Sequence, residues 1–299
     1  MMLCQGHSCC QSFTATHVIV SVLLIFLVIL LPTHAVDLKK TTGNGPGTTK
    51  GIKEIILGRC YDYTTLMKPV LKNVNCENVW NTFKSSFANK IPCKVMPSDY
   101  YNFLDLTKTG IATGKSVFWS GINKLAHDYT KVSPEYVTME DTLSGYLVNN
   151  LVWCGRTNGG DGINYERCPA YDDCADSPIK SFWFAASKYF VDAASGPVTV
   201  MLSGSADKAF RKDSVFRLLE LPVLASKAMP PPINIWVADN IEGPDKESCG
   251  KGTVAELEEY LKNKKIKYTC TDNPRAMILL QCAAHPNNSK CKDFYRINP

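Results

Sequence analysis

Short apolar runs separated by polar segments mark the second half of the chain as a mixture of strands and helices. One helix is clear, because Val254, Leu257 and Leu261 form an apolar stripe and Thr253 with Glu256 resembles a capping box. Residues 233–270 therefore predict a strand, a helix and a second strand, an order typical of a parallel sheet. The runs predicted as strands are VFW (117–119), VTVML (198–202), INIWVAD (233–239), IKYTC (266–270) and AMILLQC (276–282).

The first half of the folded sequence is mainly helical in pattern, from residue 55 to about 112. Residues 138–155, TMEDTLSGYLVNNLVWCG, place Leu143 and Leu147 at helical spacing behind a second capping box, Thr138 with Asp141. Glu140 and Asp141 then suit the helix dipole, which is a purely structural interpretation of this acidic pair. The two patterns together predict an α+β fold.

Two tryptophans lie at the edges of predicted elements. Trp183 and Ser187 are four residues apart in SFWFAASKYFVDAASG and share a helix face, beside a core stripe of other apolar residues. Trp119 ends a strand-like run, and Ser120 and Gly121 follow it as a turn signal. Ordinary core packing explains a single tryptophan, whereas two at element edges suit stacking on a planar ring.

The N-terminal segment carries an export signal. Residues 18–31, VIVSVLLIFLVILL, have the length of a signal-peptide core, and Thr33-His34-Ala35 offers a cleavage site, so residues 1–35 are predicted to be removed. The alternative is a retained signal anchor with Cys4, Cys9 and Cys10 open to palmitoylation. Residues 36–54, with TTGNGPGTT at 41–49, predict a flexible linker, and folded sequence is expected from near residue 55.

Charge and cysteine content restrict the classes of function. The 299 residues carry a formal charge of +5, and the lysine-rich run at 262–267 is interpreted as a solvated helix end, so we expect no nucleic-acid partner. Ten cysteines remain after the leader, which predicts five disulfides in an exported protein, and their spacing argues against a metal site. Only His127 and His285 lie beyond the leader, so enzymatic chemistry, if present, is expected to use carboxylates.

Several of these segments resemble the ADP-ribosyl cyclase family, which includes a molluscan ovotestis cyclase and vertebrate lymphocyte surface NAD glycohydrolases. The segments are FWSGINKLAHDY (118–129), TMEDTLSGYL with LVWCG (138–155), SFWFAAS (181–187), LELP (219–222) and NPRA with LLQC (273–282). The similarity runs from about residue 58 to 296. It implies a mostly helical subdomain (55–112 plus 138–194) and an α/β subdomain (113–137 plus 195–299) with a short, largely parallel four-stranded sheet. The active-site cleft would lie between them.

The resemblance also implies the disulfide pairs and the functional residues. The pairs would be Cys60 with Cys76, Cys93 with Cys174, Cys154 with Cys168, Cys249 with Cys270, and Cys282 with Cys291. Glu220 matches the catalytic glutamate, and Glu140 and Asp141 match the pair that recognises nicotinamide. The remaining matches are Trp119 and Trp183, which stack on the substrate, Ser187, which helps fix the ribosyl intermediate, and Ser120, Gly121 and Phe216, which contact phosphates or ribose.

Some positions depart from the family pattern. Val215 replaces an aromatic residue or a threonine, and Arg217 stands where glycine is usual, so it either reaches the diphosphate or crowds the cleft. An additional disulfide of some vertebrate members would fall near Thr113 and Ser195, neither of which is cysteine here.

The resemblance implies an exported enzyme that cleaves the nicotinamide–ribose bond of NAD and gives cyclic ADP-ribose, ADP-ribose or both, with base exchange on NADP. NAD and NADP would be substrates, and no cofactor or metal is expected. The alternative is a catalytically weak surface receptor or adhesion protein on the same fold. The location would be secreted or lumenal, or that of a type II membrane protein. A homodimer stays open, and Asn287 lies in the one N-glycosylation sequon.

Overall fold

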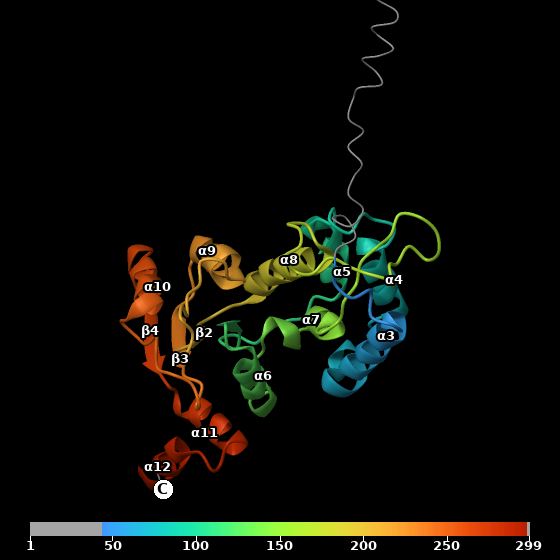
Figure 1. Cartoon of the computed structure of the whole chain (residues 1–299). Helices are drawn as coiled ribbons and strands as arrows, with labels where there is room; N and C mark the ends of the chain where they lie inside the picture. The colour runs from blue at the N-terminus through green and yellow to red at the C-terminus, as the bar shows by residue number, and fades with distance from the viewer. Residues whose placement is uncertain (1–43, 298–299) are drawn as a thin grey trace, which may run out of the picture. The chain divides into compact units, whose positions relative to one another are not determined.

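The computed structural model describes residues 44–297, so the predicted leader or anchor lies outside the described residues (Figure 1). Its centre is one sheet of four parallel strands in the order β1-β2-β3-β4. The strands are β1 (Val117–Ser120), β2 (Val198–Ser203), β3 (Ile233–Ala238) and β4 (Tyr268–Asp272). Four of the five predicted strands are therefore confirmed, the last of them displaced by two residues.

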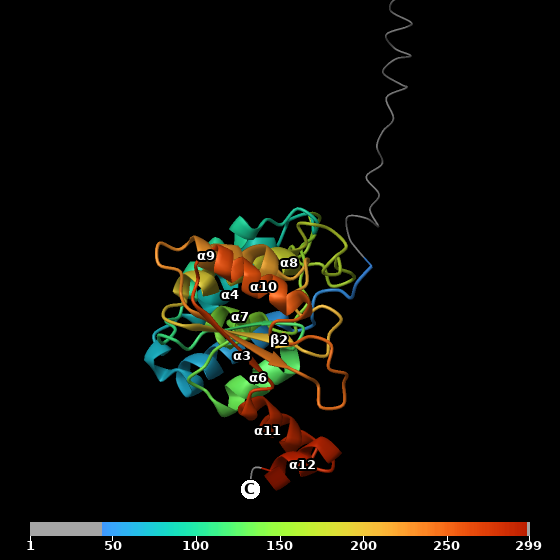
Figure 2. The same cartoon turned by 90° about the vertical axis from the view of Figure 1, so that its left-hand side faces the viewer.

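Helices cover both faces of this sheet, as parallel strands require (Figures 1 and 2). Alternate residues of one strand enter different cores: Val200 packs with α8, α9 and α10, whereas its neighbour Met201 packs with α6 and α11. β2 is buried along nearly its whole length for this reason. The helices are α6 (Asn123–Val132), α8 (Pro178–Ala193), α9 (Leu221–Ser226), α10 (Gly252–Asn263) and α11 (Arg275–Ala284).

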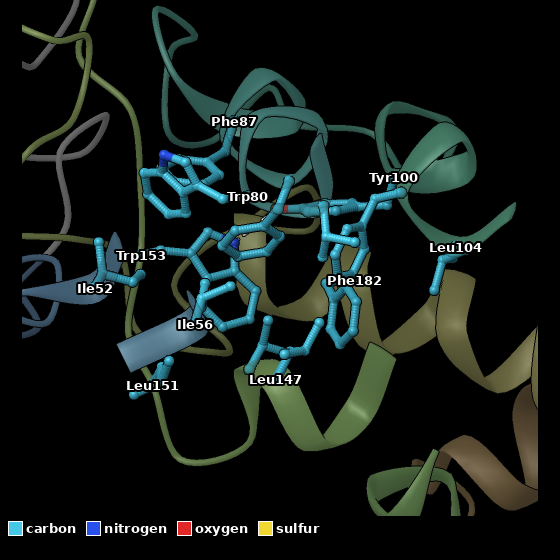
Figure 3. Close-up of a cluster of buried hydrophobic side chains, with 14 of the residues drawn as sticks. Ile52, Ile56, Trp80, Phe87, Tyr100, Leu104, Leu147, Leu151, Trp153 and Phe182 are labelled. Carbon is cyan, nitrogen blue, oxygen red and sulfur yellow. Dashed lines mark hydrogen bonds between the residues drawn. The ribbon is translucent and has the colours of Figure 1, made fainter. Parts of the chain in front are cut away.

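A second core fills the helical part and is rich in aromatic rings (Figure 3). At its centre the Trp153 indole N–H donates to the Tyr100 hydroxyl at 2.8 Å, so the polar atoms of two buried aromatic residues satisfy each other. The elements around it are α3 (Ile52–Asp62), α4 (Cys76–Phe87), α5 (Tyr101–Leu106), α7 (Leu143–Val148), the π-helical turn η1 (Tyr63–Met67) and the 3-10 turns η2 (Pro69–Leu71), η3 (Pro97–Tyr100) and η4 (Met139–Asp141).

Helix α8 joins the two cores. Phe182, near its start, is buried in the aromatic core, and Phe190, two turns later, is buried in the core on the sheet. Trp183 and Ser187 lie between these ends, so the helix carries them to the boundary of the helical and α/β parts. The predicted α+β class, with a cleft between a helical and an α/β portion, is confirmed.

The predicted strand AMILLQC is wrong, because these residues belong to α11. A short apolar run does not distinguish a strand from a buried helix, and Pro274, two residues before the run, is a helix-start signal that favours the helix. Only Met277 and Cys282 of this helix are fully buried. The final helix, α12 (Ser289–Ile297), follows after a short turn that contains Asn287.

The predicted capping box of α10 is also wrong, although the apolar stripe is confirmed. The helix begins before Thr253, with Lys251 at the N-cap position. The buried Glu247 carboxylate reaches the helix start from the preceding loop and accepts the N–H groups of Thr253 at 2.7 Å and Val254 at 3.3 Å. Glu247 thus accepts the free N–H groups at the start of α10, a role that the sequence analysis assigned to Thr253 and Glu256.

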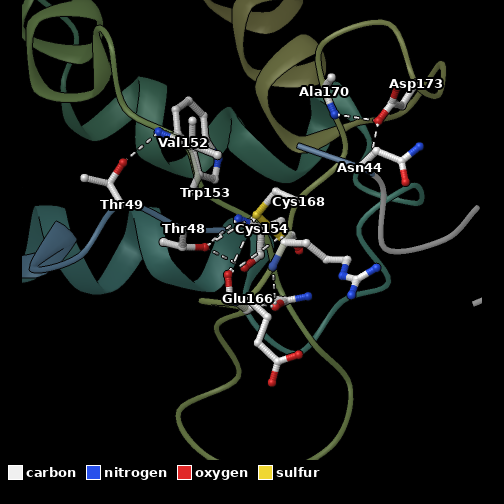
Figure 4. Close-up of a disulfide and its surroundings, with 12 residues drawn as sticks. Asn44, Thr48, Thr49, Val152, Trp153, Cys154, Glu166, Cys168, Ala170 and Asp173 are labelled. Atoms are coloured by element: carbon white, nitrogen blue, oxygen red, sulfur yellow. Dashed lines mark hydrogen bonds between the residues drawn. A yellow bond between two sulfur atoms is a disulfide. The ribbon is translucent and has the colours of Figure 1, made fainter. Parts of the chain in front are cut away.

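Ordered structure begins earlier than the expected start near residue 55. The segment 44–49 lies along the loop closed by Cys154 and Cys168 (Figure 4), where Thr48 is buried and its N–H donates to the Asn164 carbonyl. The Cys154 N–H in turn donates to the Thr48 hydroxyl at 3.1 Å. A side chain at Gly47 would collide with the Tyr165 carbonyl, so the glycine permits this close approach. Residues 44–54 are therefore not a flexible linker.

All five predicted disulfides are present, with the pairing that the family resemblance implied. The positions of the additional vertebrate bridge are also neighbours, since the Thr113 and Ser195 hydroxyls are 3.3 Å apart. No helix within residues 44–297 combines the length and apolar character needed to cross a bilayer.

Candidate active site

A cavity of about 490 Å³ lies where the two parts of the fold meet. β1 ends at it with Trp119 and Ser120, the turn η4 presents Glu140, and α8 presents Trp183 and Ser187. The π-helical turn η5 (Phe216–Glu220) supplies a further part of the wall. The structure thus brings together these predicted site residues: Trp119, Ser120, Gly121, Glu140, Trp183, Ser187, Phe216 and Glu220.

Glu220 ends the widened turn η5 and has only 6% of its surface exposed. The local sequence LELP explains the turn, because Pro222 has no N–H and would clash with a carbonyl four residues earlier in a regular helix. The Leu221 N–H instead reaches back to the Phe216 carbonyl, which is the π-helical spacing. A sequence-encoded irregularity therefore aims the glutamate into the cavity.

The environment of Glu220 favours its neutral form. Burial raises the pKa of the Glu220 carboxyl to about 8, the nearby Glu140 carboxylate adds to the rise, and a hydrogen bond from Ser187 opposes it. The Ser187 hydroxyl also lies 3.4 Å from the Met139 sulfur. The Ser187 hydroxyl has one proton and can donate it to only one of these two groups. A carboxylate is a stronger acceptor than a thioether, so donation to Glu220 is favoured.

The two tryptophans both line the cavity and are held differently. The Trp119 indole N–H donates to Glu140 at 3.3 Å, and the edge of its ring packs against His127 at a centroid distance of 6.0 Å. Trp183 packs edge-on against Phe182 at 4.8 Å and through it on the aromatic core. Both rings stay partly exposed toward the cavity, so a planar ligand can stack on them.

Asp141 is not part of the cavity wall. Its carboxylate accepts the Thr138 N–H and the Thr138 hydroxyl, each at 2.8 Å, which confirms the capping interpretation. Of the acidic pair in the sequence, Glu140 points into the site and Asp141 stabilises the turn that presents Glu140.

Arg217 neither reaches into the cavity nor crowds it, so both expectations for this residue are wrong. Its guanidinium turns outward to Glu256 and to the Phe210 carbonyl. Sequence reasoning also missed several wall residues on loops. These are Leu151, Tyr171, Ile179, Arg211, Asp213 and Ser214, and only the cluster RKDS at 211–214, just before η5, offered a signal.

Within residues 44–297 no cluster of three or more His, Cys, Asp or Glu side chains is arranged to hold a metal ion. The polar groups that the cavity does offer are the carboxylates of Glu140, Asp213 and Glu220, together with hydroxyls, amides and the exposed Arg211, which pairs with Asp213. Fold and cavity together define a disulfide-bonded α+β protein with a site lined by carboxylates and two indole rings.

Comparisons with known proteins identify the family. Residues 49–291 match the family model described as ADP-ribosyl cyclase. The chain is 37% identical over 257 residues to the ADP-ribosyl cyclase/cyclic ADP-ribose hydrolase of Aplysia californica, covering 83% of this chain and 90% of the relative. It is 35% identical over 249 residues to ADP-ribosyl cyclase/cyclic ADP-ribose hydrolase 1 of Mus musculus, covering 83% and 81%. The chain belongs to the ADP-ribosyl cyclase family.

Solved structures agree with this assignment. A crystal structure of an ADP-ribosyl cyclase complexed with N1-cIDPR matches with a TM-score of 0.74 at 34% identity, over 82% of this chain and 98% of the other. Porcine CD38 with a covalent intermediate, ribo-F-ribose-5'-phosphate, matches with a TM-score of 0.72 at 36% identity, over 77% and 99%. The family resemblance predicted from the sequence is confirmed.

Proposed function

We propose that this protein cleaves the nicotinamide–ribose bond of NAD and releases nicotinamide with cyclic ADP-ribose, ADP-ribose or both. The observation that carries the proposal is Glu220, a buried carboxyl group at the wall of a cavity that also presents Trp119 and Trp183. Its relatives bear the names of cyclases and cyclic ADP-ribose hydrolases. The cavity, about 490 Å³, is of the size that small-molecule sites have.

The chemistry needs one carboxylate. Nicotinamide leaves from NAD as a neutral base because its ring is already cationic, so no general acid has to protonate it, unlike ordinary glycoside hydrolysis. Glu220 then stabilises the cationic ribosyl centre or forms an ester with it. Because the pKa of Glu220 is raised to about 8, the cationic ring of the substrate has a second effect, which is to favour the ionised carboxylate on binding.

The products depend on what next reaches the ribosyl carbon. Water gives ADP-ribose, adenine N1 of the same molecule gives cyclic ADP-ribose, and another pyridine base gives exchange, including exchange on NADP. Ring stacking on Trp119 and Trp183 can hold the adenine near the reactive carbon and exclude water. Glu140, which borders the same space, is positioned to recognise the nicotinamide carboxamide.

The test is an assay of the full chain, expressed through the secretory pathway, with NAD as substrate and separation of nicotinamide, ADP-ribose and cyclic ADP-ribose. Stoichiometric nicotinamide and ribosyl products support the proposal. No release of nicotinamide above the rate of a Glu220→Gln control would contradict it. That result would favour the alternative, a receptor or adhesion protein on the same fold.

We further propose that the described part of the chain resides outside the cell or in the lumen of the secretory pathway, because five disulfides persist in oxidising compartments. Whether residues 1–35 are cleaved or retained as a type II anchor is decided by N-terminal sequencing of the mature protein.

Asn287 is exposed in the turn before α12, so a single glycosidase-sensitive mass shift is expected.

A further inference from the structure

The segment 210–217 forms a closed loop along one wall of the active-site cavity. Arg217, its last residue, donates from Nη1 to the carbonyl of Phe210, its first, at 3.0 Å. The guanidinium also lies over the Phe210 ring, 4.3 Å from the ring centre. The residues enclosed by this contact are cavity residues almost without exception, namely Arg211, Asp213, Ser214, Val215 and Phe216.

Helix α10 holds both ends of this loop. The Thr253 hydroxyl accepts the Phe210 N–H at 3.0 Å, and the Glu256 carboxylate accepts Arg217 Nη1 at 3.0 Å. Thr253 is fixed in turn, because its own hydroxyl proton goes to Glu247 at 2.9 Å. Thr253 and Glu256 are the two residues that the sequence assigned to a capping box, and both instead connect α10 to the cavity wall.

We propose that Arg217 is a positioning residue that clamps the cavity wall to α10 and so determines how the ribosyl intermediate divides between adenine and water. This inference rests on the proposed NAD cleavage. The clamp acts through Phe216, which adjoins Arg217 and whose ring packs against Phe210 and Phe118 at 6.1 and 6.4 Å. If this wall were free to move, it would hold the adenine less well near the ribosyl carbon and would admit water.

Bond cleavage itself depends less on the clamp. Glu220 is held independently of the clamp, by its burial and by the hydrogen bond from Ser187. A glycine at 217, which the family resemblance gives as usual, has no side chain to make the clamp.

The test compares four variants of the full chain with the wild type. Arg217→Gly removes the clamp, and Arg217→Lys keeps the charge but lacks the planar fork that reaches carbonyl, ring and carboxylate together. Glu256→Gln weakens only the contact between Arg217 and α10, and leaves the contact of Arg217 with Phe210 in place. Glu259→Gln is the matched control, because it makes the same charge change at an exposed position of α10.

Two readouts are measured. In hydrogen exchange, the backbone amides of residues 211–216 should exchange at least about tenfold faster than in the wild type in both Arg217 variants. The increase should be smaller in Glu256→Gln, and the control should exchange at the wild-type rate. In the NAD assay, Arg217→Gly should lower the ratio of cyclic to linear product at least about threefold and raise KM, with kcat for nicotinamide release within about twofold.

Unchanged exchange in Arg217→Gly would overturn the clamp. Faster exchange with an unchanged product ratio and KM would overturn its role in partitioning. If wild-type protein releases no nicotinamide, the proposed function fails, and hydrogen exchange still decides whether the clamp exists. Normal behaviour of Arg217→Lys in both readouts would show that charge alone suffices and would also contradict the proposal.

Discussion

Replacing Glu220 with glutamine should raise stability at alkaline pH while it removes activity. The folded protein retains the Glu220 proton up to a pKa of about 8, whereas the unfolded chain releases it near 4.5. Between these values the folded state binds more protons, so the carboxyl group makes the wild type progressively less stable as pH rises. An uncharged amide of the same shape has no such dependence.

The magnitude follows from the same values. A rise from 4.5 to about 8 corresponds to about 5 kcal/mol once the carboxylate is fully formed, at about 1.4 kcal/mol per pH unit. By linkage, ionisation of Glu220 lowers the unfolding free energy of the wild type by about 1 kcal/mol at pH 5 and by close to 5 kcal/mol at pH 9. The variant should therefore gain about 4 kcal/mol over the wild type across this range, or roughly 10 °C in Tm for a domain of this size.

Thermal unfolding of both proteins at pH 5, 7 and 9 measures the effect, with Glu259→Gln as a control for an exposed acid. Nicotinamide release should fall at least about 10²-fold, because the amide offers no negative charge opposite the developing cation. A Tm difference that stays constant with pH would refute the raised pKa. Near-normal nicotinamide release would refute the catalytic assignment of Glu220.

Three further predictions concern other parts of the molecule. Glu140→Ala leaves the Trp119 indole N–H without its hydrogen-bond partner. The ratio of cyclic to linear product at saturating NAD should therefore change several-fold, while nicotinamide release falls much less than in Glu220→Gln. An unchanged ratio would leave Glu140 with a local structural role only. Lys265→Gly should raise the unfolding free energy by about 0.5–1 kcal/mol in thermal or urea unfolding, because Lys265 has a φ of 56°, which glycine adopts without strain; a loss of stability would contradict this. Thr113→Cys combined with Ser195→Cys should oxidise to a sixth disulfide, seen as a loss of two hydrogens in intact mass, and should raise Tm; free thiols in the purified protein would count against the geometry.

The fold class could be predicted from the sequence because its strands are short, apolar and separated by polar segments. Periodicity failed at residues 276–282, where one apolar run fits either a strand or a helix, and only Pro274 distinguishes them. It failed again at the start of α10, since the group that caps the helix, Glu247, arrives from a loop and not from the local pattern. A local residue decides the first case, and a contact from outside the helix decides the second.

The candidate site was found mainly through the family resemblance. Helical spacing alone placed Trp183 beside Ser187, and the acidic pair in TMED had two interpretations that only the structure separates, with Glu140 in the cavity and Asp141 at the cap. Residues such as Tyr171 lie on irregular loops, for which side-chain periodicity gives no information. The outward turn of Arg217 depends on Glu256, 39 residues away, and no local pattern encodes it.

The contacts of residues 44–49 have a mechanical consequence. Backbone hydrogen bonds join Gly45 to Cys168 and Thr48 to Asn164, both in the loop closed by the Cys154–Cys168 bridge, and Thr49 to Val152, just before that loop (Figure 4). A tensile load applied to the chain ahead of residue 44 would first be distributed over these bonds and then over a covalently closed loop, which cannot unravel beyond its cross-link. Such a load would be borne at this attachment before it reached the strands and turns that present Glu140 and Glu220.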